Sequence, residues 1–126
     1  MIRLLVCMKK LPHLSTAEFL RYWLEEHGPL VKSHAAARRI KRYTQIHPYG
    51  PEALAGIVER RGGSAAKFDG LAEISWNSVE DIVAAGQSEE GRRAAAEIVE
   101  HEKTFLDLPN LEFFLGQEHV FIDGHQ

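Results

Sequence analysis

The sequence predicts one α+β domain whose strands and helices follow in the order β-α-β-β-α-β. Residues 1–8 and 68–76 repeat apolar side chains with the two-residue period of a strand. Two longer segments, beginning at Ser15 and Ser78, space their apolar residues three or four apart, as amphipathic helices do. A chain of 126 residues, 44% of them hydrophobic, has the size of a single domain with a stable core, so we expect one domain over residues 1–126.

The composition argues against nucleic acid and membranes as partners. The chain has 15 basic and 18 acidic residues spread along its length, for a net charge of -3, so no basic patch faces phosphates or anionic lipid. No apolar stretch approaches the roughly 18 residues that a membrane span requires. Cys7 is the only cysteine and cannot form an intrachain disulfide, which favours a reducing compartment. We therefore expect a cytoplasmic protein.

The first helix carries an inward-facing histidine. Ser15 and Glu18 form a capping-box pattern, which predicts that a helix begins at Ser15. Phe19, Trp23 and His27 follow at i, i+4 and i+8, so they share one face of this helix. Gly28-Pro29 then predicts a break or kink, because proline lacks a backbone donor. The histidine is thus expected at a helix end, on the buried side.

The remaining elements follow from alternation and from turn residues. The alternating run over 39–49 predicts a second strand, and the glycines and proline of 50–67 predict a long connection with a weak helical piece near 54–59. In the third strand Ala72, Ile74 and Trp76 face one way and Glu73 the other. Helix two is expected to be interrupted near Gly86, and a last strand covers 111–122.

This order is the split βαβ pattern, in which both helices pack on one face of an antiparallel sheet. The opposite face then needs a cover, and a second copy of the chain is the most economical one. We therefore predict a homodimer whose two sheets face each other.

His27 is the best candidate for a general acid or base, because an imidazole titrates near neutral pH and this one lies on an otherwise apolar face. The alternative is a buried histidine that only ties the helix to a strand. Glu73 is a candidate to orient His27 or to accept a proton, and the alternative is a solvated or ion-paired carboxylate. Aromatic and histidine side chains are the candidates for contact with a flat hydrophobic ligand, with ordinary core or dimer packing as the alternative: Phe19, Trp23, Tyr43, His47, Tyr49, Trp76 and His101.

The sequence gives no support for a metal or a phosphate-bearing cofactor. The chain has seven histidines but neither a His-Glu-x-x-His helix nor a Cys-x-x-Cys pair. The sequence Gly62-Gly63-Ser64 lacks the strand-to-helix setting of a phosphate-binding loop. We expect neither kind of cofactor.

Several segments together resemble the EthD family of dimeric α/β barrels. They are the N-terminal strand, FLRYWLEEHGPL at 19–30, FDGLAE at 68–73, FLD at 105–107 and QEHV at 117–120. The resemblance implies a ferredoxin-like subunit that pairs sheet to sheet, with a pocket between sheet and helices. Relatives take part in ether degradation or in aromatic polyketide chemistry, and the wider superfamily includes cofactor-free monooxygenases.

Two functions are compatible with these observations. The first is a cofactor-free enzyme that transfers protons on a hydrophobic or aromatic metabolite, as in decarboxylation, dehydration or cyclisation, with His27 as acid or base. The second is a non-catalytic accessory or metabolite-binding protein that supports a degradation pathway. A structural dimer without a pocket is a third possibility.

Overall fold

The computed structural model describes residues 1–124, which form a four-stranded antiparallel sheet with helices on one face. The strands are β1 (Ile2–Met8), β2 (Arg42–Ile46), β3 (Gly70–Trp76) and β4 (Glu112–Gln117). Their order across the sheet is β2-β3-β1-β4, as in a ferredoxin-like fold. The predicted α+β fold is confirmed, although the second and fourth strands are shorter than the runs 39–49 and 111–122.

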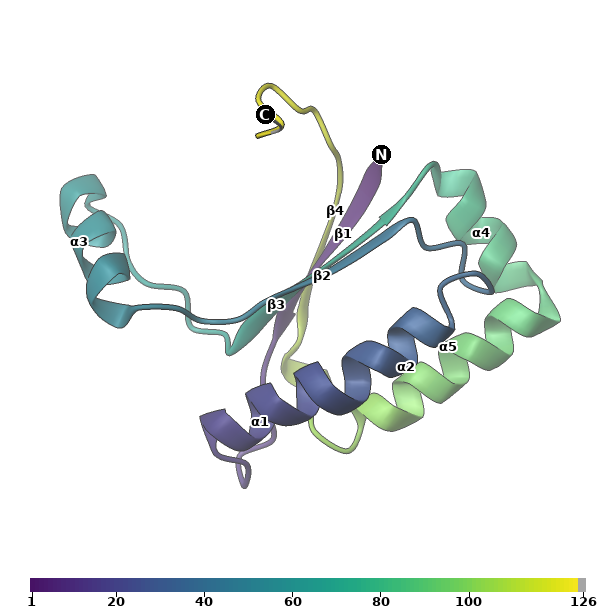
Figure 1. Cartoon of the computed structure of the whole chain (residues 1–126), viewed down its shortest axis with the longest axis horizontal. Coiled ribbons are helices and arrows are strands. Elements are labelled where there is room, and N and C mark those ends of the chain that lie inside the picture. Colours follow the sequence, from purple (N-terminus) through teal and green to yellow (C-terminus); the bar gives the residue numbers. More distant parts are fainter. Residues whose placement is uncertain (125–126) are drawn as a thin grey trace.

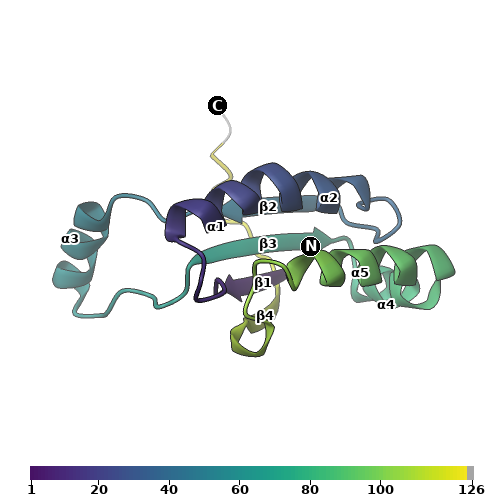
Figure 2. The same ribbon diagram turned by 90° about the horizontal axis from the view of Figure 1, so that it is seen from below.

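Two helical segments pack side by side on one face of the sheet (Figures 1 and 2). The first joins α1 (Thr16–Tyr22), a π-helical turn η1 (Trp23–His27) and α2 (Gly28–Ser33) without interruption. The second consists of α4 (Val79–Gln87) and α5 (Glu89–Glu102), followed by the short 3-10 turn η2 (Leu108–Asn110). None of the helices in the described part of the chain is long and apolar enough to cross a membrane.

The helix ends follow the capping residues. Ser15 and Glu18 form the predicted capping box at the start of α1. The break in helix two lies at Ser88, whose hydroxyl accepts a bond from the backbone N–H of Gly91 at 2.9 Å, slightly later than the expected position near Gly86. Of the predicted break or kink at Gly28-Pro29, the break is wrong: the helix continues through this point, and the local distortion is the wide turn η1.

The connection between β2 and β3 contains a longer helix than predicted, α3 (Pro51–Arg61). This helix projects from the body of the protein at the far side from α4 (Figure 1). None of its residues is buried in the single chain. The segment from β2 to β3 thus forms an arm rather than part of the core.

Aromatic side chains of the first helix form the centre of the core. Phe19 and Trp23 are fully buried and stack with their ring centroids 5.7 Å apart, and Phe105 lies 5.8 Å from Phe19. Val6 and Met8 of β1 and other buried residues pack against these rings. This cluster fixes the first helix over the central strands.

The sheet has two different faces. Leu4, Val6 and Ala72 point toward the helices, whereas Leu5, Glu73 and Phe114 are paired across the strands on the outer face. No helix within residues 1–124 covers the outer face (Figure 1). The outer face is therefore available for another molecule.

Gly70 begins β3 at the point where the Trp23 indole reaches the sheet. A Cβ atom at Gly70 would lie 2.6 Å from Cζ3 of Trp23, and neither the fully buried ring nor the strand has room to move. We expect Gly70→Ala to lower the free energy of unfolding by roughly 1–3 kcal/mol through overpacking, as measured by urea denaturation.

Gly63→Ala is the matched control, because a Cβ atom there meets nothing within 4 Å. Both substitutions restrict the unfolded chain in the same way, so their difference isolates the contact with Trp23. Equal stability of the two variants would contradict this account of the packing.

Candidate functional site

His27 reaches the interior because the turn before Pro29 is widened. The buried residues Phe19, Trp23, His27 and Val31 are spaced by four, and at 3.6 residues per turn each step of four drifts about 40° around a helix. The π-helical turn η1 removes part of this drift, since the N–H of Gly28 bonds the carbonyl oxygen of Trp23, five residues back. The four side chains therefore remain on the face toward the sheet.

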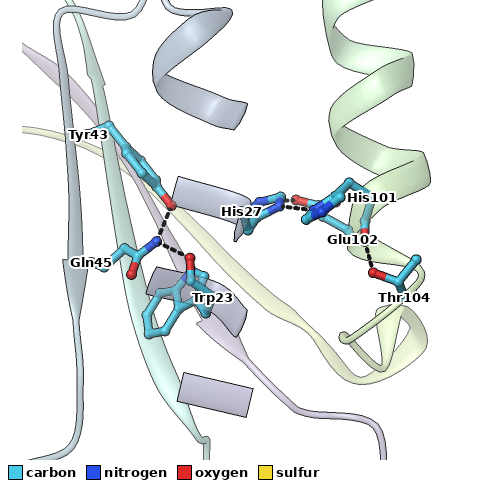
Figure 3. Close-up of polar contacts among 7 residues, drawn as sticks. All are labelled: Trp23, His27, Tyr43, Gln45, His101, Glu102 and Thr104. Atoms are coloured by element: carbon cyan, nitrogen blue, oxygen red, sulfur yellow. Dashed lines mark hydrogen bonds and ion pairs between the residues drawn. The ribbon is translucent and has the colours of Figure 1, made fainter. Parts of the chain in front are cut away.

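His27 is 2% exposed and faces helix α5 (Figure 3). Its Nδ1 lies 2.9 Å from Nδ1 of His101, and the two rings are nearly parallel. Its other nitrogen, Nε2, lies 3.9 Å from Oε2 of Glu102. Phe105 packs against the imidazole with ring centroids 4.9 Å apart. One ring nitrogen is thus hydrogen-bonded and the other faces a carboxyl group.

The hydrogen bonds continue from His101 toward the surface. Nε2 of His101 lies 3.1 Å from the hydroxyl of Tyr22, which lies 3.0 Å from Oγ1 of Thr104. The Thr104 hydroxyl donates to the backbone carbonyl of His101 at 2.6 Å. A chain of side chains therefore connects buried His27 with exposed Thr104.

Burial shifts the pKa values of His27 and Glu102 in opposite directions. It lowers the pKa of His27 to about 4, and nearby His101 adds to this effect. Burial raises the pKa of Glu102 to about 7. Removing a charge from water disfavours the charged form of each group. At neutral pH His27 is uncharged, so its contact with Glu102 is not an ion pair, and Glu102 exchanges its proton near neutrality.

The two groups share a cavity of about 360 Å³ between the sheet and the helices. Its walls are mainly aliphatic residues of β1, β3 and α5, and its polar lining includes His27, Glu102, Tyr43 and Arg38. This volume and this mixture are typical of a site for a small organic molecule. A wider groove of about 740 Å³ between α2 and β2 is lined by neither His27 nor Glu102, so the cavity beside His27 is the better candidate.

Three of the predicted site residues line this cavity: His27, Tyr43 and Trp76. His101 lies directly behind His27 and is not among the lining residues. Burial raises the pKa of the Tyr43 phenol, whose oxygen accepts a bond from Nε2 of Gln45 at 2.9 Å. The indole of Trp76 donates to the carbonyl of Arg38 at 2.9 Å, which holds the ring against one wall.

The other predicted ligand contacts lie elsewhere. Phe19 and Trp23 are fully buried in the core and do not line the cavity. His47 stacks on Trp23 with ring centroids 4.5 Å apart and bonds Gln45 at 2.8 Å. Tyr49 is 91% exposed, at the beginning of the arm that carries α3. In the single chain Phe19, Trp23 and His47 therefore pack with one another, and Tyr49 lies on the surface away from the cavity.

Glu73 does not approach His27. It lies on the outer face of the sheet and pairs with Arg3 at 3.2 Å, and Arg3 also contacts Glu118. A strand turns successive side chains to opposite faces, so Glu73 is separated from His27 by the sheet itself. The structure thus supports the alternative of a paired carboxylate.

Glu102 takes the position expected of Glu73. The signal for it was present in the sequence, since Ile98, Glu102 and Phe105 are spaced as one face of a helix, and a carboxylate on an apolar face is unusual. Arg38 also lines the cavity without having been predicted as a site residue. It lies in the irregular segment between α2 and β2, where no periodicity indicates which way a side chain points. Within residues 1–124, no three His, Cys, Asp or Glu side chains are arranged to hold a metal ion.

The opposite pKa shifts predict opposite effects on stability. Glu102, with its pKa raised from 4.5 to about 7, destabilises the fold as pH rises through this range. His27, with its pKa lowered from 6.5 to about 4, destabilises the fold as pH falls through that range. Each effect amounts to about 3 kcal/mol over its full range, so the two largely cancel between pH 4.5 and 6.5.

We expect single variants to reveal each effect in urea denaturation. Relative to the parent protein, Glu102→Gln gains stability as pH rises from 4.5 to 7, because only the His27 effect remains. His27→Gln loses stability over the same range, because only the Glu102 effect remains. If the free energy of unfolding changed with pH in the same way in both variants, burial would not lower the pKa of His27 while raising that of Glu102.

Comparison with known proteins agrees with the fold. The family model described as "EthD domain" matches residues 11–109. No curated protein sequence matches the chain closely enough to report. An EthD family protein from Bacillus halodurans C-125 is 16% identical, with a TM-score of 0.60 over 94% of this chain and 100% of its own.

Two further solved structures have the same fold. An EthD-like protein from Ralstonia eutropha JMP134 is 18% identical, with a TM-score of 0.57 over 97% of this chain and 93% of its own. The hydroxynitrile lyase of Passiflora edulis is 17% identical, with a TM-score of 0.51 over 94% of this chain and 95% of its own. The match to the domain model covers most of the residues, and the chain belongs to the EthD family.

Proposed function

We propose that the chain is a cofactor-free enzyme that transfers protons on a small hydrophobic or aromatic metabolite bound between the sheet and the helices. The observation that carries this proposal is the pair of His27 and Glu102 in one apolar cavity of about 360 Å³. A neutral imidazole is a base and a protonated carboxyl is an acid, and these two coexist near neutral pH. Decarboxylation, dehydration and cyclisation are reactions that such a pair can catalyse.

The walls of the cavity suit a flat substrate with few polar groups. Aliphatic side chains and the ring of Trp76 make most of the lining apolar, so a bound substrate would displace water and strengthen each polar interaction inside. In this scheme His27 accepts a proton from a carbon or hydroxyl of the substrate, and Glu102 donates one to the oxygen that gains charge. Arg38 also lines the cavity, and its guanidinium would stabilise negative charge on that oxygen.

The second candidate is a binding protein without catalysis. It is favoured by the contact between His27 and His101, which satisfies one ring nitrogen without any ligand. One protein of the same fold is a hydroxynitrile lyase, so the fold accommodates an enzyme, but a fold alone does not determine a reaction. The two candidates differ in whether His27 exchanges a proton with the bound molecule.

A flat ketone with acidic C–H bonds separates the two candidates. We expect the protein to bind 2-tetralone and to accelerate uptake of deuterium from D₂O at the carbon next to the carbonyl, followed by NMR. His27→Gln should slow this exchange by about 100-fold or more, the usual effect of a general base. His13→Gln, at an exposed position before α1, is the control and should leave the rate unchanged.

Binding of 2-tetralone with no acceleration in the parent protein would favour the non-catalytic candidate. Binding itself is tested with Ala95→Leu, which fills the cavity, against Ala96→Leu on the exposed side of the same helix. If Ala95→Leu bound the ketone as tightly as Ala96→Leu, the cavity would not be the ligand site.

We also infer a homodimer that pairs through the outer face of the sheet. Apolar side chains interrupt the charged ones on that face, among them Leu5, Leu71 and Phe114, the last of which is 65% exposed in the single chain. Phe121 and Ile122, after β4, are more than 90% exposed. Two solved structures of this fold are described as dimeric. A second copy would remove this apolar surface from water.

Light scattering should therefore give twice the chain mass of 14.2 kDa at micromolar concentration. Phe114→Arg places a charge on the outer face and should shift the protein toward the monomer. Val83→Arg, on the exposed side of α4, is the control and should keep the dimer mass. A monomer mass for the parent protein would contradict the inferred pairing.

A further inference from the structure

In the chain of hydrogen bonds from Thr104 to His27, the donor and acceptor of each bond follow from the proton of the Thr104 hydroxyl. The hydroxyl of Thr104 has one proton, which it donates to the carbonyl of His101 at 2.6 Å. Its oxygen is then an acceptor for Tyr22, 3.0 Å away, so the proton of the Tyr22 hydroxyl points to Thr104. The Tyr22 oxygen in turn accepts from Nε2 of His101 at 3.1 Å.

The same direction continues to the cavity. A neutral imidazole that carries its proton on Nε2 has a bare Nδ1, so Nδ1 of His101 accepts from Nδ1 of His27 at 2.9 Å. The proton of His27 is then on Nδ1, and its Nε2 carries a free lone pair. That lone pair lies 3.9 Å from Glu102, whose protonated carboxyl can donate toward it.

We infer that Tyr22, acting through His101, is a positioning residue that holds His27 in the tautomer with a bare Nε2 toward the cavity. This inference rests on the proposed function for its catalytic meaning, since a bare Nε2 is what a base requires. The tautomer of a histidine is set by the bond that its other nitrogen makes. Tyr22 touches neither the cavity nor Glu102 among the contacts described.

The surroundings of His27 support this arrangement. The ionisable groups that face it or share its cavity are His101 and Glu102 on α5, Tyr43 on β2 and Arg38 after α2. The Tyr43 oxygen accepts from Gln45, and Nη1 of Arg38 donates to the carbonyl of Gly91 at 3.3 Å. Neither of these groups is hydrogen-bonded to the imidazole of His27, so His101 decides where its proton resides.

The test is the tautomer of His27 in the ligand-free protein at pH 7, where an ordinary imidazole is mostly uncharged, read from the ¹⁵N shifts of its ring. We expect the parent protein to carry the proton on Nδ1. Tyr22→Phe keeps the ring that stacks on His101 but removes the acceptor of its Nε2–H. Because a half-buried donor that loses its partner is destabilised, His101 should move its proton to Nδ1 and His27 should move its proton to Nε2.

Tyr43→Phe is the matched control, because it removes a hydroxyl that borders the cavity without touching either histidine. It should leave both tautomers as in the parent protein. A proton on Nε2 of His27 in the parent protein, or an unchanged tautomer in folded Tyr22→Phe, would overturn the inference.

A second measurement links the tautomer to the reaction. In the 2-tetralone assay, Tyr22→Phe should lower the exchange rate at saturation by at least about tenfold and leave the dissociation constant unchanged. The NMR result does not depend on turnover. If the parent protein failed to exchange deuterium while its His27 carried the proton on Nδ1, the proposed function would fail and the tautomer assignment would stand.

Discussion

The absence of a backbone donor at Pro29 is the constraint on which the site depends. A helix normally ends before proline, and here it continues because the turn from Trp23 to His27 takes in an extra residue. The carbonyl of Trp23 accepts both the N–H of Gly28 and Nε2 of Gln45 at 2.9 Å, which ties the wide turn to β2. The helix thereby keeps His27 and Val31 on the same buried face as Phe19 and Trp23.

Burial then gives two neighbouring groups different roles. In water, between the ordinary pKa values of 4.5 for the carboxyl and 6.5 for the imidazole, the two groups carry opposite charges and attract each other. Behind the walls of this cavity each loses its charge, so His27 becomes a neutral base and Glu102 a neutral acid. Helix α5 supplies both Glu102 and the histidine that bonds His27, so the packing of α5 against η1 assembles the pair.

The sequence predicts the fold well because the fold depends on periodicity and capping. The alternating residues of 1–8 form strand β1. The serines at 15, 78 and 88 cap the N-termini of helices α1, α4 and α5. The site is less predictable, since contacts between helices depend on how each helix is rotated. Periodicity placed His27 inward but could not show that α5 would bring Glu102 to it. It also could not show that Glu73 lies on the opposite face of the sheet, paired with Arg3 and out of reach of His27.

The two faces of the sheet differ in what they contact: one packs against the helices, and the other is uncovered in the single chain over residues 1–124. On the helix side the chain fills its own core and leaves a cavity of about 360 Å³ beside His27 and Glu102. On the outer side ion pairs such as Arg3 with Glu73 alternate with apolar residues that nothing in the described chain covers. β1 and β3 contribute residues to both faces, so a partner on the outer face would restrain the strands that floor the cavity. Assembly and ligand binding would then be coupled through the position of these strands rather than through a direct contact.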